Sequence, residues 1–294
     1  MNLALQYAID ALNVGGLYAL MALGIGLIFG IMRLINFAHG EIVMVGAYAM
    51  WLVVDMPTPA VIAFSLVVVA LVALGIERIA FRPLRGASPS TLLIASFAVA
   101  YFLQNLAVMV FGARAKPFAF AEVLSHNVEI GGLRVAVLQI VTLALTVLAL
   151  GGLTLLLKRT SIGVQLRAAS QDFHAARLCA VRANRVIALA FVISGVLGWI
   201  VSFVYSAQVA QLTPAMGVRP VVIGFVATIL GGLGSLSGAV IGGFLVGVIT
   251  VLLDATLPVE LRVFKEAFLF GLVLLVLLVR PQGLIAVAAL KERV

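Results

Sequence analysis

Residues 135–157 read VAVLQIVTLALTVLALGGLTLLL and contain no charged side chain. About 20 predominantly apolar residues are enough for an α-helix to cross the hydrocarbon core of a bilayer. Similar runs recur along the chain, in which 64% of residues are hydrophobic and 10% are charged. In lipid only helices and closed barrels satisfy their own backbone groups, and barrel strands alternate polar and apolar residues. The unbroken runs therefore predict an all-α, polytopic membrane protein, with residues 1–294 forming a single transmembrane domain.

The apolar runs predict nine membrane segments, and the count is expected to lie between eight and ten. They are expected at residues 9–31, 41–54, 58–76, 91–111, 135–157, 186–205, 218–231, 236–254 and 264–279. Residues 41–54 would make only about 21 Å of helix, short of the ~30 Å hydrocarbon core. We therefore expect a broken or partly re-entrant helix there.

Basic residues gather in the loops on one predicted side of the membrane. The loops at 32–40, 77–90, 158–185, 232–235 and 280–294 hold thirteen of the nineteen Lys and Arg residues. Cytoplasmic loops carry such an excess. This side is predicted to be cytoplasmic, with the N-terminus outside and the C-terminus inside. Topology thus explains the basic charge, and no nucleic-acid partner is expected.

The longest polar stretch, residues 158–185, reads KRTSIGVQLRAASQDFHAARLCAVRANR, with six basic residues against Asp172. From Gly163 it is predicted to form a short helix, with Ser161 as its N-cap. One face of that helix would carry apolar residues at helical spacing, namely Leu166, Ala169, Phe173, Ala176 and Ala180. Three interpretations stay open: a helix lying on the membrane surface, a basic loop without a partner, or a helix whose apolar residues enter a groove of a soluble protein.

Glycine residues interrupt the apolar pattern at residues 33–46, RLINFAHGEIVMVG, and at 231–243, GGLGSLSGAVIGG. Interrupted segments in corresponding positions of two halves indicate a transport pathway. The bland alternatives are a loop position near the cytoplasmic interface for His39, and helix–helix contact for Gly238, Gly242, Gly243 and Gly247. The candidate pathway residues are Asn36, His39, Glu41, Gly231, Gly232, Gly234 and Ser235.

The sequence contains no residues arranged for catalysis. It has no phosphate-binding G-x-x-x-x-G-K-[ST] loop, so ATP hydrolysis is not expected on this chain. The three histidines are far apart and there is one cysteine, so no metal site is expected. Most acids fall at segment ends, which argues against a proton-coupled carrier, whereas Glu41 lies beside a break. The chain is predicted to be neither an enzyme nor a cofactor-binding protein.

Four short motifs, in this order and spacing, resemble the branched-chain amino acid permease family of ABC importers. They are Asn36-Phe37-Ala38-His39-Gly40, Arg159-Thr160-x-x-Gly163 leading to Arg167-Ala168-x-x-Gln171-Asp172, GGLGSLSGAVIGG, and Arg280-Pro281-Gln282-Gly283-Leu284. The resemblance covers essentially the whole chain. It implies a type II ABC importer-like permease of the bacterial inner membrane that translocates branched-chain or other amino acids.

The resemblance also implies partners and contact residues. The partners would be a second homologous permease subunit, two ATP-binding cassette subunits and an extracytoplasmic solute-binding protein, around a chain embedded in the lipid bilayer. The cytoplasmic coupling loop 158–185 would dock on the ATPase through Gly163, Arg167, Ala168, Gln171 and Asp172. The chain departs from the family pattern where Ala180 replaces a Gly and where Gly224 replaces a Lys before Phe225.

A rival hypothesis comes from a different functional class. The chain could be an ATP-independent channel or facilitator for a small polar solute such as urea or an amide, with residues 158–185 as a plain connecting loop. A requirement for a separate ATPase would distinguish the two hypotheses.

Overall fold

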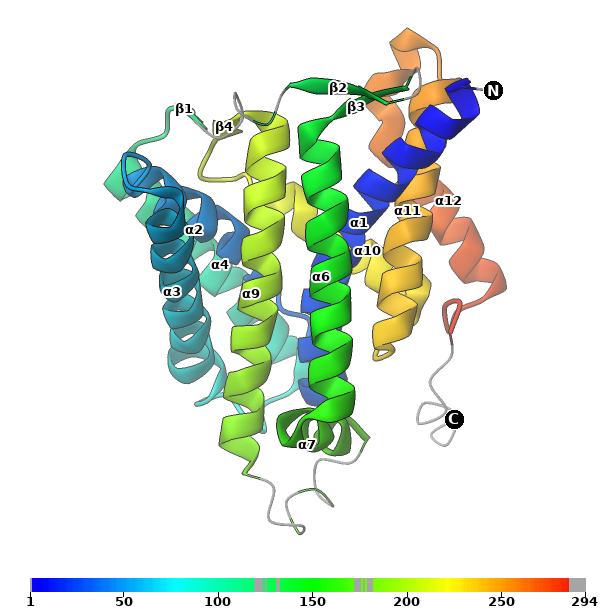
Figure 1. The fold of residues 1–294 in the computed structure, drawn as a ribbon. Coiled ribbons are helices and arrows are strands. Elements are labelled where there is room, and N and C mark those ends of the chain that lie inside the picture. Colours follow the sequence, from blue (N-terminus) through cyan, green and yellow to red (C-terminus); the bar gives the residue numbers. More distant parts are fainter. Residues whose placement is uncertain are drawn as a thin grey trace.

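The computed structural model describes residues 2–118, 124, 126–130, 133–171, 176, 178 and 182–285. Most of them are helical, which confirms the all-α class (Figure 1). Within these residues six helices are long and apolar enough to cross a membrane. They are α1 (Asn2–Met32), α3 (Thr58–Gly75) with the π-helical turn η1 (Ile76–Phe81), α4 (Pro89–Phe111), α6 (Val137–Arg159), α9 (Ala183–Val209) and α11 (Leu236–Thr256).

Three shorter apolar helices complete the set. They are α2 (His39–Leu52), α10 (Val218–Gly231) and α12 (Lys265–Val279), the last preceded by the 3₁₀ turn η2 (Val259–Phe264). Each of the nine predicted segments therefore corresponds to a helix, with ends that differ by a few residues. An additional helix, α7 (Ser161–Gln171), lies across one end of the bundle (Figure 1).

Helix α1 forms the centre of the bundle. It packs against α11, α9, α10 and α6, and residues such as Leu20 and Ala22 are completely buried. A helix that is apolar on all sides is expected to be buried on all sides. By contrast, only 17% of the apolar window of α4, and the same share of α6, is buried. These outer helices offer their apolar side chains to lipid or to another subunit.

The first of two discontinuous crossings lies between α1 and α3. Helix α1 ends at Met32, and Arg33 reverses the chain with a left-handed φ of 53°. Residues 33–38 return into the bundle without forming a helix. Helix α2 begins inside the bundle, because its first residue, His39, packs against Gly24, which lies eight residues before the end of α1. At about 21 Å, α2 spans only part of the hydrocarbon core. The prediction of a broken crossing at 41–54 is confirmed.

The second discontinuous crossing follows α9 and was not predicted. The chain turns at Ala210, which has a φ of 58°, forms strand β4 (Gln211–Leu212) and returns into the bundle through residues 213–217. Helix α10 then begins where α2 begins, because Gly217 and Gly40 meet so closely that a Cβ on either would overlap the other's carbonyl oxygen. The two half-helices start at one point inside the bundle and run towards opposite ends.

The predicted break at 231–243 is confirmed as a tight turn that joins α10 to α11. Gly232 and Gly234 adopt left-handed φ angles of 113° and 88° there. The Ser235 hydroxyl caps α11 by accepting a hydrogen bond from the Gly238 N–H at 3.0 Å. The glycines that follow contact neighbouring helices. Gly243 lies on the backbone of Ala19, and Gly247 lies on that of Gly15. The helix-contact interpretation of this glycine series is confirmed.

Short ribbons cover the end of the bundle at which α1 begins (Figure 1). Strand β1 (Lys116–Pro117) pairs with β4, and β2 (Asn127–Ile130) pairs with β3 (Leu133–Ala136), both antiparallel. At the opposite end, the N–H groups of Leu284 and Ile285 donate to the carbonyls of Leu230 and Gly231, at 2.9 and 3.0 Å. The first and last described residues therefore lie at opposite ends, as an odd number of crossings requires.

Candidate translocation and coupling sites

The segment Asn36–Glu41 is enclosed by the bundle. Asn36, His39 and Glu41 are each at most 1% exposed. The Asn36 Oδ1 atom accepts a hydrogen bond from the Ala38 N–H at 3.1 Å, which shapes the start of α2. Its Nδ2 atom has no hydrogen-bond partner among the described residues. Because a buried polar atom is normally satisfied, this amide is a candidate ligand-binding group.

His39 is a core residue, so its placement near the cytoplasmic interface was wrong. The imidazole is fully buried between Gly24 of α1 and Gly198 of α9. Its Nδ1 atom lies 3.1 Å from the Ser194 Oγ, and that hydroxyl donates to the Gly24 carbonyl at 2.9 Å. Since a hydroxyl has a single hydrogen to donate, His39 Nδ1 must carry the proton of this contact. The arrangement joins α1, α2 and α9 at the point where α2 starts.

Glu41 carries a carboxylate inside the bundle, on the first turn of α2. Its Oε1 atom accepts a hydrogen bond of 2.7 Å from the Gln104 side-chain amide of α4. Its Oε2 atom is buried and has no partner within the part of the chain that the structure describes. A charged group in this environment is costly unless something completes its interactions.

Three aromatic rings form a layer beside this carboxylate, which we call the Phe37 layer. Phe37 stacks on Phe97 of α4 with ring centroids 4.4 Å apart, and it tilts against Phe225 of α10 at 5.4 Å. Phe37 precedes Glu41 by four residues, and Phe97 precedes Gln104 by seven, or about two helical turns. The aromatic layer therefore lies about one turn from Glu41 along the chain and about two turns from Gln104 along α4.

Helix α7 begins two residues earlier than predicted, and its cap is a different residue. The Thr160 hydroxyl, not that of Ser161, accepts the hydrogen bond from the Gly163 N–H, at 3.0 Å. Gly163 itself lies against the carbonyls of Leu156 and Leu157 at the end of α6, where a Cβ would not fit. A glycine is therefore required for the tight junction between α6 and α7.

The predicted apolar face of the loop 158–185 is confirmed at the three of its residues that the structure describes. Leu166, Ala169 and Ala176 are 2%, 3% and 5% exposed. These residues pack on the permease itself, so they are not available as anchors in a groove of another protein. Phe173 and Ala180 lie outside the described residues.

The opposite face of α7 is open. The side chains of Val164 and Arg167 are exposed there, and Ile162, one turn before Leu166, is exposed at the start of the helix. Ala168 is half-buried. The side chain of Gln171 and the whole of Asp172 lie outside the described residues.

A small cavity connects α7 to the turn between α10 and α11. Its volume is about 50 Å³, and its lining includes Arg167 and Ser170 of α7, Gly30 of α1 and Gly234 of the turn. Gly234 also lies near the Arg33 guanidinium. Helix α7 and the turn that follows α10 therefore face each other across this cavity.

The candidate pathway residues form two separate groups. Asn36, His39 and Glu41 lie inside the bundle, where α10 begins at Gly217. Gly231, Gly232, Gly234 and Ser235 lie in the turn at the other end of α10, about 21 Å away along a 14-residue helix. The structure does not bring the two groups together. Gly217 was not among the predicted site residues, although Pro214 and Gly217 are turn-forming residues in the loop that precedes α10.

The pairing of Gln104 with Glu41 was also missed. Gln104 stood out only as one of several polar residues in apolar segments, and 63 residues separate it from its partner. Nothing local in the sequence indicates which polar groups of different helices will meet.

A bundle of apolar helices with two discontinuous crossings and buried polar groups where they start defines a polytopic membrane permease. The model of the family described as "Branched-chain amino acid transport system / permease component" matches residues 7–278. The chain belongs to this family, which confirms the resemblance found in its motifs.

Curated relatives match over nearly their whole length. The chain is 33% identical to the high-affinity branched-chain amino acid transport system permease protein BraD of Pseudomonas aeruginosa, covering 96% of this chain and 95% of the relative. It is 31% identical to the LivH protein of the same description from Escherichia coli K12 and 32% identical to that of Salmonella typhimurium, with the same coverage. No solved structure matches the chain.

Proposed function

We propose that this chain is the translocating subunit of an ABC importer that carries branched-chain amino acids across the bacterial inner membrane. The observation that carries the proposal is the match to permease relatives over 96% of the chain, with identities of 31–33%. Those relatives are named as permease proteins of high-affinity branched-chain amino acid transport systems. Substrate would arrive from an extracytoplasmic solute-binding protein, and two separate ATP-binding cassette subunits would supply the energy.

A second permease subunit is proposed to pack against α4. The exposed face of this helix carries Tyr101, 72% exposed, and the amide of Asn105. A polar side chain that faces lipid tails is unfavourable, whereas one that faces another subunit or a water-filled passage can be satisfied. This face therefore supports a passage shared between two subunits rather than contact with lipid alone.

The open face of α7 is proposed to bind an ATPase subunit through Val164 and Arg167. Gly163, Ala168, Gln171 and Asp172 would complete this coupling segment. Movement of α7 would press on Gly234 and displace α10, whose other end contacts α2 through Gly217 and Gly40. ATP-driven closure of the ATPases would thus change the opening of the bundle where both half-helices begin.

The face that carries α7 is proposed to be cytoplasmic, which places the N-terminus outside and the C-terminus inside. The support is the excess of Lys and Arg in the loops of that face. The glycine turn Gly231–Ser235 would then lie at the cytoplasmic end of the passage, and Asn36, His39 and Glu41 would lie deeper within it.

The rival function, an ATP-independent facilitator for urea or an amide, has no support among the relatives described above. Substrate class is tested by competition. The chain is assembled with its ATPases and binding protein in proteoliposomes, and uptake of radiolabelled leucine is measured against an excess of other amino acids, amides or urea. Competition by leucine, isoleucine and valine is expected. Competition by urea or amides alone would overturn the amino-acid assignment.

A further inference from the structure

Glu41 is unusual among the described acids because it is almost fully buried and no basic side chain pairs with it. The side chain is 1% exposed, Oε1 is held by the Gln104 amide, and Oε2 has no partner among the residues that the structure describes. One neutral hydrogen bond does not compensate a carboxylate for the loss of water.

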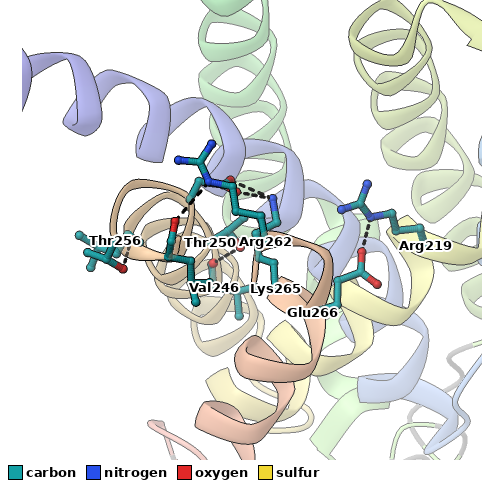
Figure 2. Close-up of polar contacts among 10 residues, drawn as sticks. Arg219, Val246, Thr250, Thr256, Arg262, Lys265 and Glu266 are labelled. Atoms are coloured by element: carbon teal, nitrogen blue, oxygen red, sulfur yellow. Dashed lines mark hydrogen bonds and ion pairs between the residues drawn. The ribbon is translucent and has the colours of Figure 1, made fainter. Parts of the chain in front are cut away.

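Three other acids in or near the bundle are paired with a base, whereas Asp10 of α1 accepts hydrogen bonds from the amides of Gln6 and Gln139. Glu77, which is buried, pairs with Arg85. Asp254 binds Lys265 at 2.8 Å, and Glu266 binds Arg219 at 2.5 Å at the junction of α10 with α12, as Figure 2 shows for Arg219 and Glu266. These basic side chains are already engaged. Within the described part of the chain, no basic side chain pairs with Glu41, whose one hydrogen-bond partner there is the Gln104 amide.

The missing partner should therefore come from outside the chain, and it should carry positive charge and hydrogen-bond donors. An ammonium group meets both requirements, with three donors around one charge. If the proposed function is right, every amino acid that passes through the permease brings an α-ammonium group. The neighbouring Phe37 layer offers an apolar surface for the side chain of such a molecule.

We infer that Glu41 binds the α-ammonium group of an amino acid in transit, while Phe37, Phe97 and Phe225 contact its aliphatic side chain. This inference rests on the proposed import of amino acids. Asn36, whose buried Nδ2 is an unused donor in the same segment, is placed to serve the carboxylate of the same molecule. The polar ends and the apolar side chain of a branched-chain amino acid would thus each meet a matching group.

Access to Glu41 would be opened by a movement of α4. That helix packs on the rest of the chain mainly through α2 and η1, and only 17% of its apolar window is buried. Its Gln104 amide occupies one carboxylate oxygen of Glu41 in the present conformation. When α4 moves away from α2, the amide leaves, and the ammonium group can replace it. Gln104 therefore acts as a stand-in for the substrate between transport cycles.

The test compares leucine uptake with ATP hydrolysis in proteoliposomes that contain the complete transporter. Glu41→Gln removes the charge and keeps the shape, Glu41→Asp keeps the charge, and Asp55→Asn removes an exposed acid as a control. For Glu41→Gln we expect leucine uptake to fall about tenfold or more, while ATP hydrolysis stimulated by loaded binding protein stays close to wild type. Glu41→Asp should recover part of the uptake, and Asp55→Asn should change neither activity.

Two results would overturn the inference. Unchanged uptake by Glu41→Gln would show that the carboxylate does not meet the substrate. Parallel loss of uptake and ATP hydrolysis in both Glu41 variants would show that the residue only holds α2 against α4. Absence of leucine uptake by the wild-type transporter would instead contradict the proposed function itself.

A second measurement needs no variant. Dicyclohexylcarbodiimide modifies carboxyl groups in apolar surroundings, and mass spectrometry can locate the modification at Glu41. Leucine-loaded binding protein with ATP should lower this modification relative to empty binding protein with ATP. Equal modification under both conditions would contradict binding at Glu41.

Discussion

Gly40 and Gly217 meet backbone to backbone inside the bundle, where α2 and α10 both begin. Neither residue can carry a Cβ without overlapping the other's carbonyl oxygen. This contact joins two half-helices that run to opposite ends of the molecule. It also joins α10 to the buried segment that contains His39 and Glu41.

Gly217→Ala is expected to destabilise the permease by forcing the two half-helices apart. Overpacking of this kind costs about 1–3 kcal/mol. Gly151→Ala is the matched control, because a Cβ at that helical position meets nothing within 4 Å, and Ala favours a helix over Gly by ~1 kcal/mol. Thermal unfolding in detergent should show a lower midpoint for Gly217→Ala and an equal or higher one for Gly151→Ala. Equal midpoints for wild type and Gly217→Ala would refute the close contact.

Arg167→Ala is expected to uncouple the permease from its ATPase without unfolding it, because this side chain is exposed on the open face of α7. Arg262→Ala is the control, since it removes the same charge from an exposed residue at the other end of the bundle. Co-purification with the ATPase subunit and stimulated ATP hydrolysis should fall for Arg167→Ala alone. If the two variants behave alike, α7 is not the docking element.

Thr160→Ala should weaken α7 more than Ser161→Ala, because Thr160 and not Ser161 caps the helix. Loss of an N-cap costs about 0.5–2 kcal/mol. Hydrogen exchange of the amide groups at 163–166 gives the local readout. Faster exchange in Thr160→Ala and little change in Ser161→Ala are expected. The reverse order would restore Ser161 as the cap.

Ser194→Ala should destabilise the junction of α1, α2 and α9, because it leaves His39 Nδ1 and the Gly24 carbonyl without their shared hydroxyl. Removing one partner from buried groups costs about 1–3 kcal/mol. Ser90→Ala, at an exposed position near the start of α4, is the control. The unfolding midpoint should fall for Ser194→Ala only, and a midpoint equal to that of the control would contradict the buried arrangement.

Orientation is tested by cysteine labelling in a Cys179→Ser background. Val164→Cys on α7 should react with a membrane-impermeant maleimide only from the cytoplasmic side. Glu260→Cys, exposed in η2 at the other end of the bundle, should react only from outside. Labelling from the opposite sides would invert the proposed topology.

The sequence alone predicts much of this fold because the number and position of the apolar runs depend only on local composition. The broken crossing at 41–54 could also be predicted, since its helix is too short for the hydrocarbon core. The same length argument applies to α10, which has 14 residues, and it would have indicated the second broken crossing. Only the glycine-rich break at 231–243 was predicted in this region, and it is the turn that follows α10.

The candidate site depended on contacts that no local pattern encodes. The motif containing Asn36, His39 and Glu41 could be chosen as a candidate because it interrupts an apolar run. That His39 is packed against two glycines, and that Gln104 binds Glu41, follows only from the packing of four helices. The same holds for the loop 158–185. Helical spacing predicted which of its faces is apolar, but only the fold shows that this face packs against the rest of the chain.

The most direct test of the proposed import function is leucine uptake into proteoliposomes that contain the permease, its partner permease subunit, the ATPase subunits and the binding protein. We expect leucine to accumulate only when ATP, ATPase subunits and binding protein are all present. Leucine, urea or amide entry at the same rate in vesicles that lack the ATPase would contradict that function, and would identify the chain as a facilitator.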